Sequence, residues 1–233
     1  MMVQDFHPLS QFVTMNTAFL QVVKDRKLAH VLRQVADDFE ILDFFKQYGS
    51  CCFGMSAMLA QILTEKGHAA RVQGCYGEIK QNNGVFYIGY KGFTHEQQKE
   101  GHAVCIVDEQ YLIDFGLGSL RKFYAEDFSH ALACEISGDN PVLGHLDLDS
   151  GATITWRTDW VSPMVKLELE HQLAAVERIL SGYYDFQKNR MAYLIKKLFV
   201  GKNIPIPNPA VLARVKAHSS AQAQDKKLSE LVD

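Results

Sequence analysis

The stretch "GSCCFGMSAMLAQILTEKG", residues 49–67, places two adjacent cysteines at the start of a helical pattern. Apolar side chains recur in it at the three- and four-residue steps of one helix face, namely Met55, Met58, Leu59, Ile62 and Leu63. We therefore expect a helix over 52–66, with Ser50 able to cap its start and Gly67 ending it. Because the N–H groups and the dipole at a helix start favour negative charge, a cysteine there is a candidate thiolate.

The pattern changes after this helix, and most of the next hundred residues read as strands. Four segments have strand character: 68–79, 84–93, 101–107 and 110–116. Two more, 132–138 and 151–158, are weaker strand candidates. Helical periodicity covers 10–46, with a break expected near 25–27, and it returns over 163–200. Helices and strands that are segregated along the chain predict an α+β fold rather than an alternating α/β fold.

The same pattern suggests three parts of the chain. We expect a core with N-terminal helices over 1–160, a C-terminal helical extension over 161–218 that packs on the core, and a flexible tail over 219–233. The tail "SSAQAQDKKLSELVD" is polar and offers little to bury.

Composition narrows the classes of partner. The chain has 233 residues, 47% of them hydrophobic, and a formal net charge of −3, which argues against a nucleic-acid or an anionic-membrane partner. The start "MMVQDFHPLSQF" lacks the basic and apolar regions of a secretory signal, and no apolar run suits a membrane span. Five cysteines without such a signal favour reduced thiols and a cytoplasmic location.

Two polar residues interrupt neighbouring apolar strand patterns downstream of the cysteines. His102 stands in "GHAVCIV" and Asp114 stands in "YLIDFG". Aspartate is a poor strand former and is costly to bury alone, and a histidine on the next strand can partner it. A cysteine nucleophile needs a base, and a carboxylate that orients the base completes the set. We therefore predict that His102 and Asp114 act with one cysteine of the adjacent pair.

The loop between these two strands tests that prediction. With a two-residue loop, Ala103 would face Asp114, and His102 would point to the opposite side of the sheet. With a three-residue loop, 108–110, Asp114 would lie diagonal to His102 on the same face, within reach of a hydrogen bond. The Cys-His-Asp hypothesis thus requires an odd loop or a bulge here.

The motifs "GSCCFG", "GHAARVQG", "GHAV" and "YLIDFGLG" occur in this order over residues 49 to 118. They resemble the core of the transglutaminase-like and arylamine N-acetyltransferase-like branches of the papain-like cysteine enzyme superfamily. "DFGLG" is similar to the Asp-x-Gly-Phe-Gly of the acetyltransferases, and "GHAARVQG" to the Gly-x-x-Ala-Arg strand of the transglutaminase-like proteins. The resemblance implies a papain-like core with Cys52, His102 and Asp114 as its triad. The N-terminal segment typical of the acetyltransferases is not evident, so the branch stays open.

The choice between the two cysteines rests on their neighbours, because the helix wheel places both equally far from the apolar stripe. Cys52 stacks over Ser56 and Ala60, which leaves room for a facing histidine, whereas Cys51 stacks over a large methionine. The family cysteine also precedes the helix-ending glycine by the same interval as here (67 − 52 = 15). We predict that Cys51 packs and that Cys52 reacts.

Two further residues belong to the predicted site. Gln47, or Tyr48 in its place, could donate to the oxyanion beside the backbone N–H of Cys52, by analogy with a papain-type glutamine, although a loop residue of this kind is more often simply solvated. Phe53 could line the pocket, although an aromatic there is usually core. We expect no metal, because adjacent cysteines chelate one tetrahedral ion poorly, and we expect no cofactor.

Together these residues predict thiol-based acyl chemistry on a small-molecule or peptide acyl substrate, through a thioester on Cys52. Release of the acyl group by water would make a peptidase or amidase, and release by an amine would make an acyltransferase or transglutaminase. Two alternatives stay open: a non-catalytic binding module on the same fold, and a redox sensor that uses Cys51 and Cys52. The C-terminal helices could dock a protein partner in either case.

Overall fold

A computed structural model describes residues 22–49, 51–81, 84–91, 100–118, 131–148 and 151–200, with side chains up to residue 195. The chain divides into two compact units, Met1–Glu170 and His171–Asp233, and each is described here by itself. The first unit combines helices with an antiparallel sheet, so the α+β prediction is confirmed.

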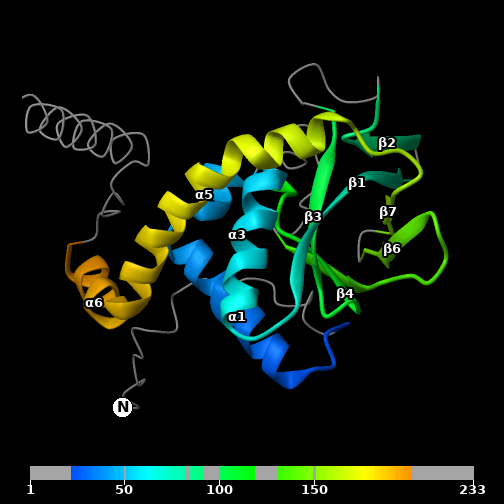
Figure 1. Cartoon of the computed structure of the whole chain (residues 1–233). Coiled ribbons are helices and arrows are strands. Elements are labelled where there is room, and N and C mark those ends of the chain that lie inside the picture. Colours follow the sequence, from blue (N-terminus) through cyan, green and yellow to red (C-terminus); the bar gives the residue numbers. More distant parts are fainter. Residues whose placement is uncertain are drawn as a thin grey trace, which may run out of the picture. The chain divides into compact units, whose positions relative to one another are not determined.

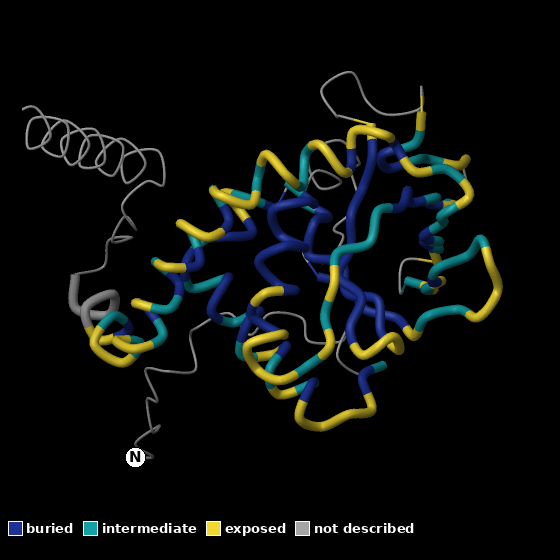
Figure 2. Tube along the Cα trace, viewed as in Figure 1, coloured by how far each residue is buried: buried dark blue, intermediate teal, exposed yellow. Residues whose placement is uncertain are grey.

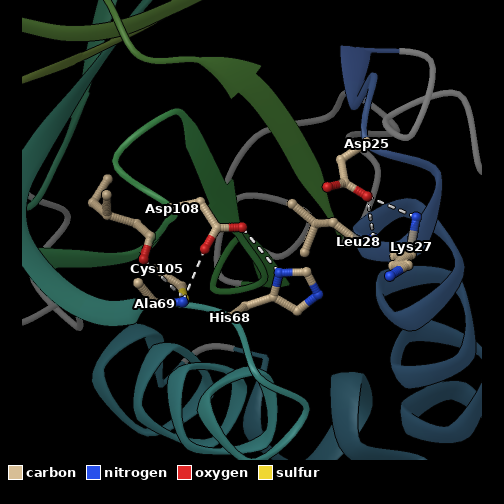
Figure 3. Close-up of polar contacts among 8 residues, drawn as sticks. Asp25, Lys27, Leu28, His68, Ala69, Cys105 and Asp108 are labelled. Carbon is tan, nitrogen blue, oxygen red and sulfur yellow. Dashed lines mark hydrogen bonds and ion pairs between the residues drawn. The ribbon is translucent and has the colours of Figure 1, made fainter.

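Among the described residues before residue 70, three helices precede the sheet: α1 (Arg26–Ile41), α2 (Phe44–Tyr48) and α3 (Cys52–Glu65). Asp25 caps α1, because its Oδ1 accepts the N–H groups of Lys27 at 2.7 Å and Leu28 at 3.1 Å (Figure 3). Helix α1 begins at Arg26, which confirms the predicted break near residues 25–27. The helix expected before this break lies largely outside the described residues. A second break, at Asp43 with a φ of 62°, separates α1 from α2 and was not predicted.

Helix α3 confirms the helix predicted over 52–66, and it is the most deeply buried helix of this unit (Figure 2). Residues 52–60 are all buried, not only the predicted apolar stripe. Gly67, with a φ of +92°, ends the helix as predicted. The N–H of His68 bonds the carbonyl of Leu63 and the N–H of Gly67 bonds that of Thr64, both at 3.0 Å, which is the Schellman pattern. Ser50, the predicted cap, lies outside the described residues.

The sheet contains seven strands, joined in antiparallel pairs in the order β5-β4-β3-β1-β7-β6, with β2 also paired to β1. Their bounds are β1 (Ala70–Gln81), β2 (Gly84–Ile88), β3 (His102–Val107), β4 (Tyr111–Asp114), β5 (Leu132–Glu135), β6 (Val142–Asp147) and β7 (Thr153–Arg157). The sequence pattern predicted every strand except β6.

The sheet is nearly closed. Ile136, just after β5, forms an isolated bridge with Gly144 of β6, so the two ends of the strand order meet. The long strand β1 links the two halves, because its residues 70–75 pair with β3 and its residues 76–80 pair with β7. The sheet interior holds a buried core that includes Val104, Leu112 and Trp156. Helix α3 packs against β3 and β1 (Figure 1).

Helix α5 (Met164–Lys188) begins in the first unit and continues into the second, and α6 (Arg190–Val200) follows it. The single helix predicted over 163–200 is therefore interrupted at Asn189. In the second unit, the rings of Phe186 and Tyr193 meet edge to face across this break, with centroids 5.1 Å apart. Among the described residues, no helix combines the length and the apolar character that crossing a membrane requires.

Candidate functional site

The hairpin between β3 and β4 has the odd loop that the Cys-His-Asp hypothesis required. Val107 pairs with Tyr111, so three residues, 108–110, lie between the paired positions. Continued along the strands, this register puts Asp114 diagonal to His102 on one face of the ladder. The predicted loop is confirmed.

His102 and Asp114 meet inside the protein. His102 Nε2 lies 2.7 Å from Asp114 Oδ2, and the residues are 1% and 0% exposed. The other carboxylate oxygen, Oδ1, accepts the backbone N–H of Gly116 at 2.8 Å. Because Nε2 is engaged with Asp114, Nδ1 is the ring nitrogen left to exchange a proton with another group.

Cys52 is that neighbouring group, at the first residue of α3. Burial lowers the pKa of His102, but the Asp114 carboxylate and the Cys52 side chain, through charge and hydrogen bonding, outweigh burial and raise this pKa to about 10. Cys52 is 8% exposed and packs among Phe53, Ala103 and Val165. As the first residue of a helix, it has a backbone N–H without an intrahelical partner, which can serve a developing oxyanion.

Two glycines after β4 let the chain pass directly over the start of α3. A Cβ on Gly116 would stand 2.6 Å from both Cα and Cβ of Cys52 and 3.4 Å from Asp114 Oδ1. Gly118 donates its N–H to the carbonyl of Gly49 at 2.8 Å, and a Cβ there would stand 2.7 Å from the same carbonyl carbon. Only glycine fits so close an approach. The segment after Asp114 therefore runs directly over Cys52 and keeps the Asp114 carboxylate near that residue.

The other predicted site residues lie differently. Phe53 is buried beside Cys52, as the core alternative had it. Gln47 is exposed on α2, and its side chain makes no hydrogen bond to Cys52, His102 or Asp114 in the described part of the chain. Cys51 is half-buried, whereas Cys52 is buried, so the expectation that Cys51 is the packed member of the pair is wrong. The assignment of Cys52 as the reactive thiol stays a prediction.

Trp156 is the site residue that the sequence prediction missed. Its Nε1–H donates to Asp114 Oδ2 at 2.8 Å, and both side chains are fully buried. Trp156 lies on β7, 42 residues after Asp114. Its place in the alternating strand "TITWR" predicts burial, but no local pattern relates β7 to β4.

The remaining cysteines lack the features of a nucleophile. All five cysteines are thiols without a disulfide. Burial raises the pKa of the Cys75 and Cys105 thiols well above the usual range and that of Cys134 to about 12. In the described part of the chain, no three His, Cys, Asp or Glu side chains gather as a metal site would need.

A second His–Asp pair lies at the tip of the same hairpin (Figure 3). Asp108 Oδ2 lies 2.9 Å from His68 Nδ1, and its Oδ1 accepts the N–H of Ala69 at 2.8 Å. Asp108 and Glu109 have φ angles of 53° and 50°. Glu109 also holds Arg71 through two hydrogen bonds, of 2.6 and 2.9 Å. These contacts fasten the loop that sets the register of β4.

Comparison with known proteins assigns no family to this chain, because no family model, no curated protein and no solved structure matches it.

Proposed function

We propose that this protein is a thiol-dependent acyl-transfer enzyme, with Cys52 as nucleophile, His102 as proton carrier and Asp114 as the group that orients His102. The observation that carries the proposal is the buried His102 ring, whose Nε2 lies 2.7 Å from Asp114 Oδ2 and which also interacts with Cys52 through charge and hydrogen bonding. A raised pKa of His102 favours an imidazolium beside the sulfur, and this is the partner that a reactive thiolate needs.

In the proposed first step, Cys52 Sγ attacks the carbonyl carbon of an amide, ester or thioester. A C–S bond forms, and the electron pair of the carbonyl moves to oxygen, which the helix-start N–H groups can stabilise. When the C=O bond reforms, the bond to the leaving group breaks, and the leaving group takes the proton from the His102 imidazolium. The enzyme is left with an acyl thioester on Cys52 and a neutral imidazole.

In the second step, His102 takes a proton from the acceptor, the acceptor attacks the thioester, and Cys52 leaves as the thiolate. Water as acceptor gives a hydrolase, and an amine gives an acyltransferase. The resemblance of residues 49–118 to transglutaminase-like and arylamine N-acetyltransferase-like proteins supports this class of chemistry and a papain-like core, and both remain part of the proposal.

The adjacent cysteines allow an internal control for the test. Iodoacetamide would be reacted at pH 6 with the full-length protein and with its Cys51→Ser and Cys52→Ser variants. Peptide mass spectrometry would measure the rate of alkylation at each cysteine. We expect Cys52 to react at least ~10-fold faster than a free thiol, because a neighbouring imidazolium favours the reactive thiolate. Equal slow labelling of both cysteines would contradict the proposal.

The substrate class needs a separate experiment. The intact protein would be incubated with acyl thioesters and amides, and its mass followed for an acyl adduct that Cys52→Ser abolishes and Cys51→Ser retains. Addition of amines then separates transfer from hydrolysis. Reversible oxidation of the Cys51–Cys52 pair that is unaffected by His102→Gln, with no acyl adduct, would instead favour the redox sensor.

A further inference from the structure

Trp156 lies inside the sheet, beside two glycines of neighbouring strands. Gly77 of β1 and Gly144 of β6 both stand directly opposite Trp156 in the ladder. A Cβ on Gly144 would lie 2.5 Å from Cys134 Sγ and 3.7 Å from Trp156 Cε3. The indole is fully buried in the core of the sheet, and its N–H reaches Asp114 of β4.

At β4 the indole N–H meets the same carboxylate oxygen as the imidazole. His102 lies 2.7 Å and Trp156 lies 2.8 Å from Asp114 Oδ2, while Gly116 donates to Oδ1 at 2.8 Å. Three donors fix the plane of a carboxylate that is shut off from water. Each donor draws negative charge toward itself, so the indole reduces the charge that Oδ2 presents to the imidazole.

We propose that Trp156 is a positioning residue for the candidate Cys52–His102 pair: its N–H holds the Asp114 carboxylate in place and limits the negative charge that acts on His102. The inference rests on the proposed function, in which the imidazolium must form beside the thiolate and later release its proton. An imidazolium whose pKa is raised too far is a poor acid toward the leaving group, because general acids work best when their pKa lies near the operating pH. The pKa of His102 is already raised to about 10, so a donor that limits this rise helps His102 to release its proton.

In the described part of the chain, few titratable groups act on His102, which makes the effect measurable. Asp114 from β4 and Cys52 from α3 raise its pKa, and burial lowers it. Cys75 of β1 stands directly opposite His102 in the ladder, and burial raises the pKa of that thiol, which keeps it neutral near pH 7. A change at Trp156 therefore reaches His102 mainly through Asp114.

The test uses the fact that the chain has two tryptophans. In full-length Trp160→Phe protein, Trp156 is the only one left, and it can be replaced biosynthetically by fluorinated tryptophans. These keep the shape of the indole and make its N–H a stronger donor. The titration of His102 would be followed by NMR of labelled histidine, with His102→Gln to assign the signal, and Trp156→Phe would be measured beside it.

We expect Trp156→Phe to raise the pKa of His102 by about 0.5–1 unit, the size of one hydrogen bond's contribution. Fluorination strengthens the same bond and should lower the pKa of His102 by a fraction of that amount. A pKa of His102 that does not fall as the indole becomes a stronger donor overturns the inference, because a merely structural tryptophan leaves it unchanged. This arm does not depend on whether Trp156→Phe folds. If Cys52 is alkylated no faster than Cys51 while the pKa of His102 follows the indole, the proposed function fails and the coupling of Trp156 to His102 stands.

Discussion

One hairpin carries the aspartates of two His–Asp pairs, and their surroundings differ more than their geometry does. The nitrogen–oxygen distance is 2.7 Å between His102 and Asp114 and 2.9 Å between His68 and Asp108. The side chains are 1% and 0% exposed in the first pair but 12% and 34% exposed in the second. The buried pair adjoins a thiol and an indole, whereas the exposed pair holds a backbone N–H. A short His–Asp contact therefore marks a candidate site only where water is excluded and a nucleophile is near.

The largest expected effect separates the two histidines. His102→Gln should slow alkylation of Cys52 by iodoacetamide at pH 6 by about 100-fold, because the thiolate loses its imidazolium. His68→Gln should leave the rate within about twofold, because His68 contacts the loop and not the thiol. Rates come from peptide mass spectrometry of full-length proteins. Similar losses in both variants would remove the distinction between the pairs.

A glycine pair tests the close approach over Cys52. Gly116→Ala should lower the free energy of unfolding by about 1–3 kcal/mol and slow alkylation of Cys52, because its Cβ would collide with backbone and Cβ atoms of that residue. Gly138→Ala is the matched control, since a Cβ there meets nothing within 4 Å. Urea unfolding measures both. A Gly116→Ala protein as stable as the control would show that the segment after Asp114 can shift away.

Stability against pH tests the buried pair by itself. The pKa of His102 is raised above its usual value, so its protonation stabilises the folded state fully below pH 6.5, and this contribution is lost as the pH rises toward about 10. We expect the stability advantage of wild type over His102→Gln to shrink steadily as the pH rises across this window. Cys52→Ser removes one of the two groups that raise the pKa of His102, so this contribution should be smaller and its loss should be complete at a lower pH. An advantage that is flat with pH would contradict the raised pKa.

The smallest effect is expected at the hairpin tip. Asp108→Ala should cost about 1 kcal/mol of unfolding free energy through its lost hydrogen bonds, without slowing alkylation of Cys52. Asp108→Gly loses the same bonds but relaxes a backbone held at a φ of 53°, so it should cost less than Asp108→Ala. Thermal or urea unfolding of the pair measures the difference. If Asp108→Ala also slows alkylation of Cys52, the hairpin tip affects the reactivity of the candidate site as well as holding the loop in place.

Local sequence patterns predicted the parts of the site that lie close together in the chain. The helix that begins at Cys52 follows from apolar spacing and from Gly67. The shared face of His102 and Asp114 follows from two polar residues in neighbouring apolar strands, because an unpaired buried aspartate is costly. The structure adds the loop of three residues on which this depended.

Parts that depend on distant pairing were not predicted. Strand β6 was missed because Gly144 breaks its alternation, and that glycine is needed for the space near Cys134 and Trp156. The bond from Trp156 to Asp114 depends on how β7 pairs with β1, which no local period encodes. The break at Asn189 was missed because the apolar spacing continues on both sides of it.

The partition of β1 between two sets of partners has a consequence for the order of folding. The β3–β4 hairpin is local and can form early. Trp156 lies 42 residues after Asp114 and reaches it only after β7 has docked on residues 76–80 of β1. Until then the carboxylate lacks one of its three buried donors. We expect the Cys52–His102 pair to mature in the last folding phase, so that a chain with a formed hairpin and an undocked β7 holds an unassembled thiol site.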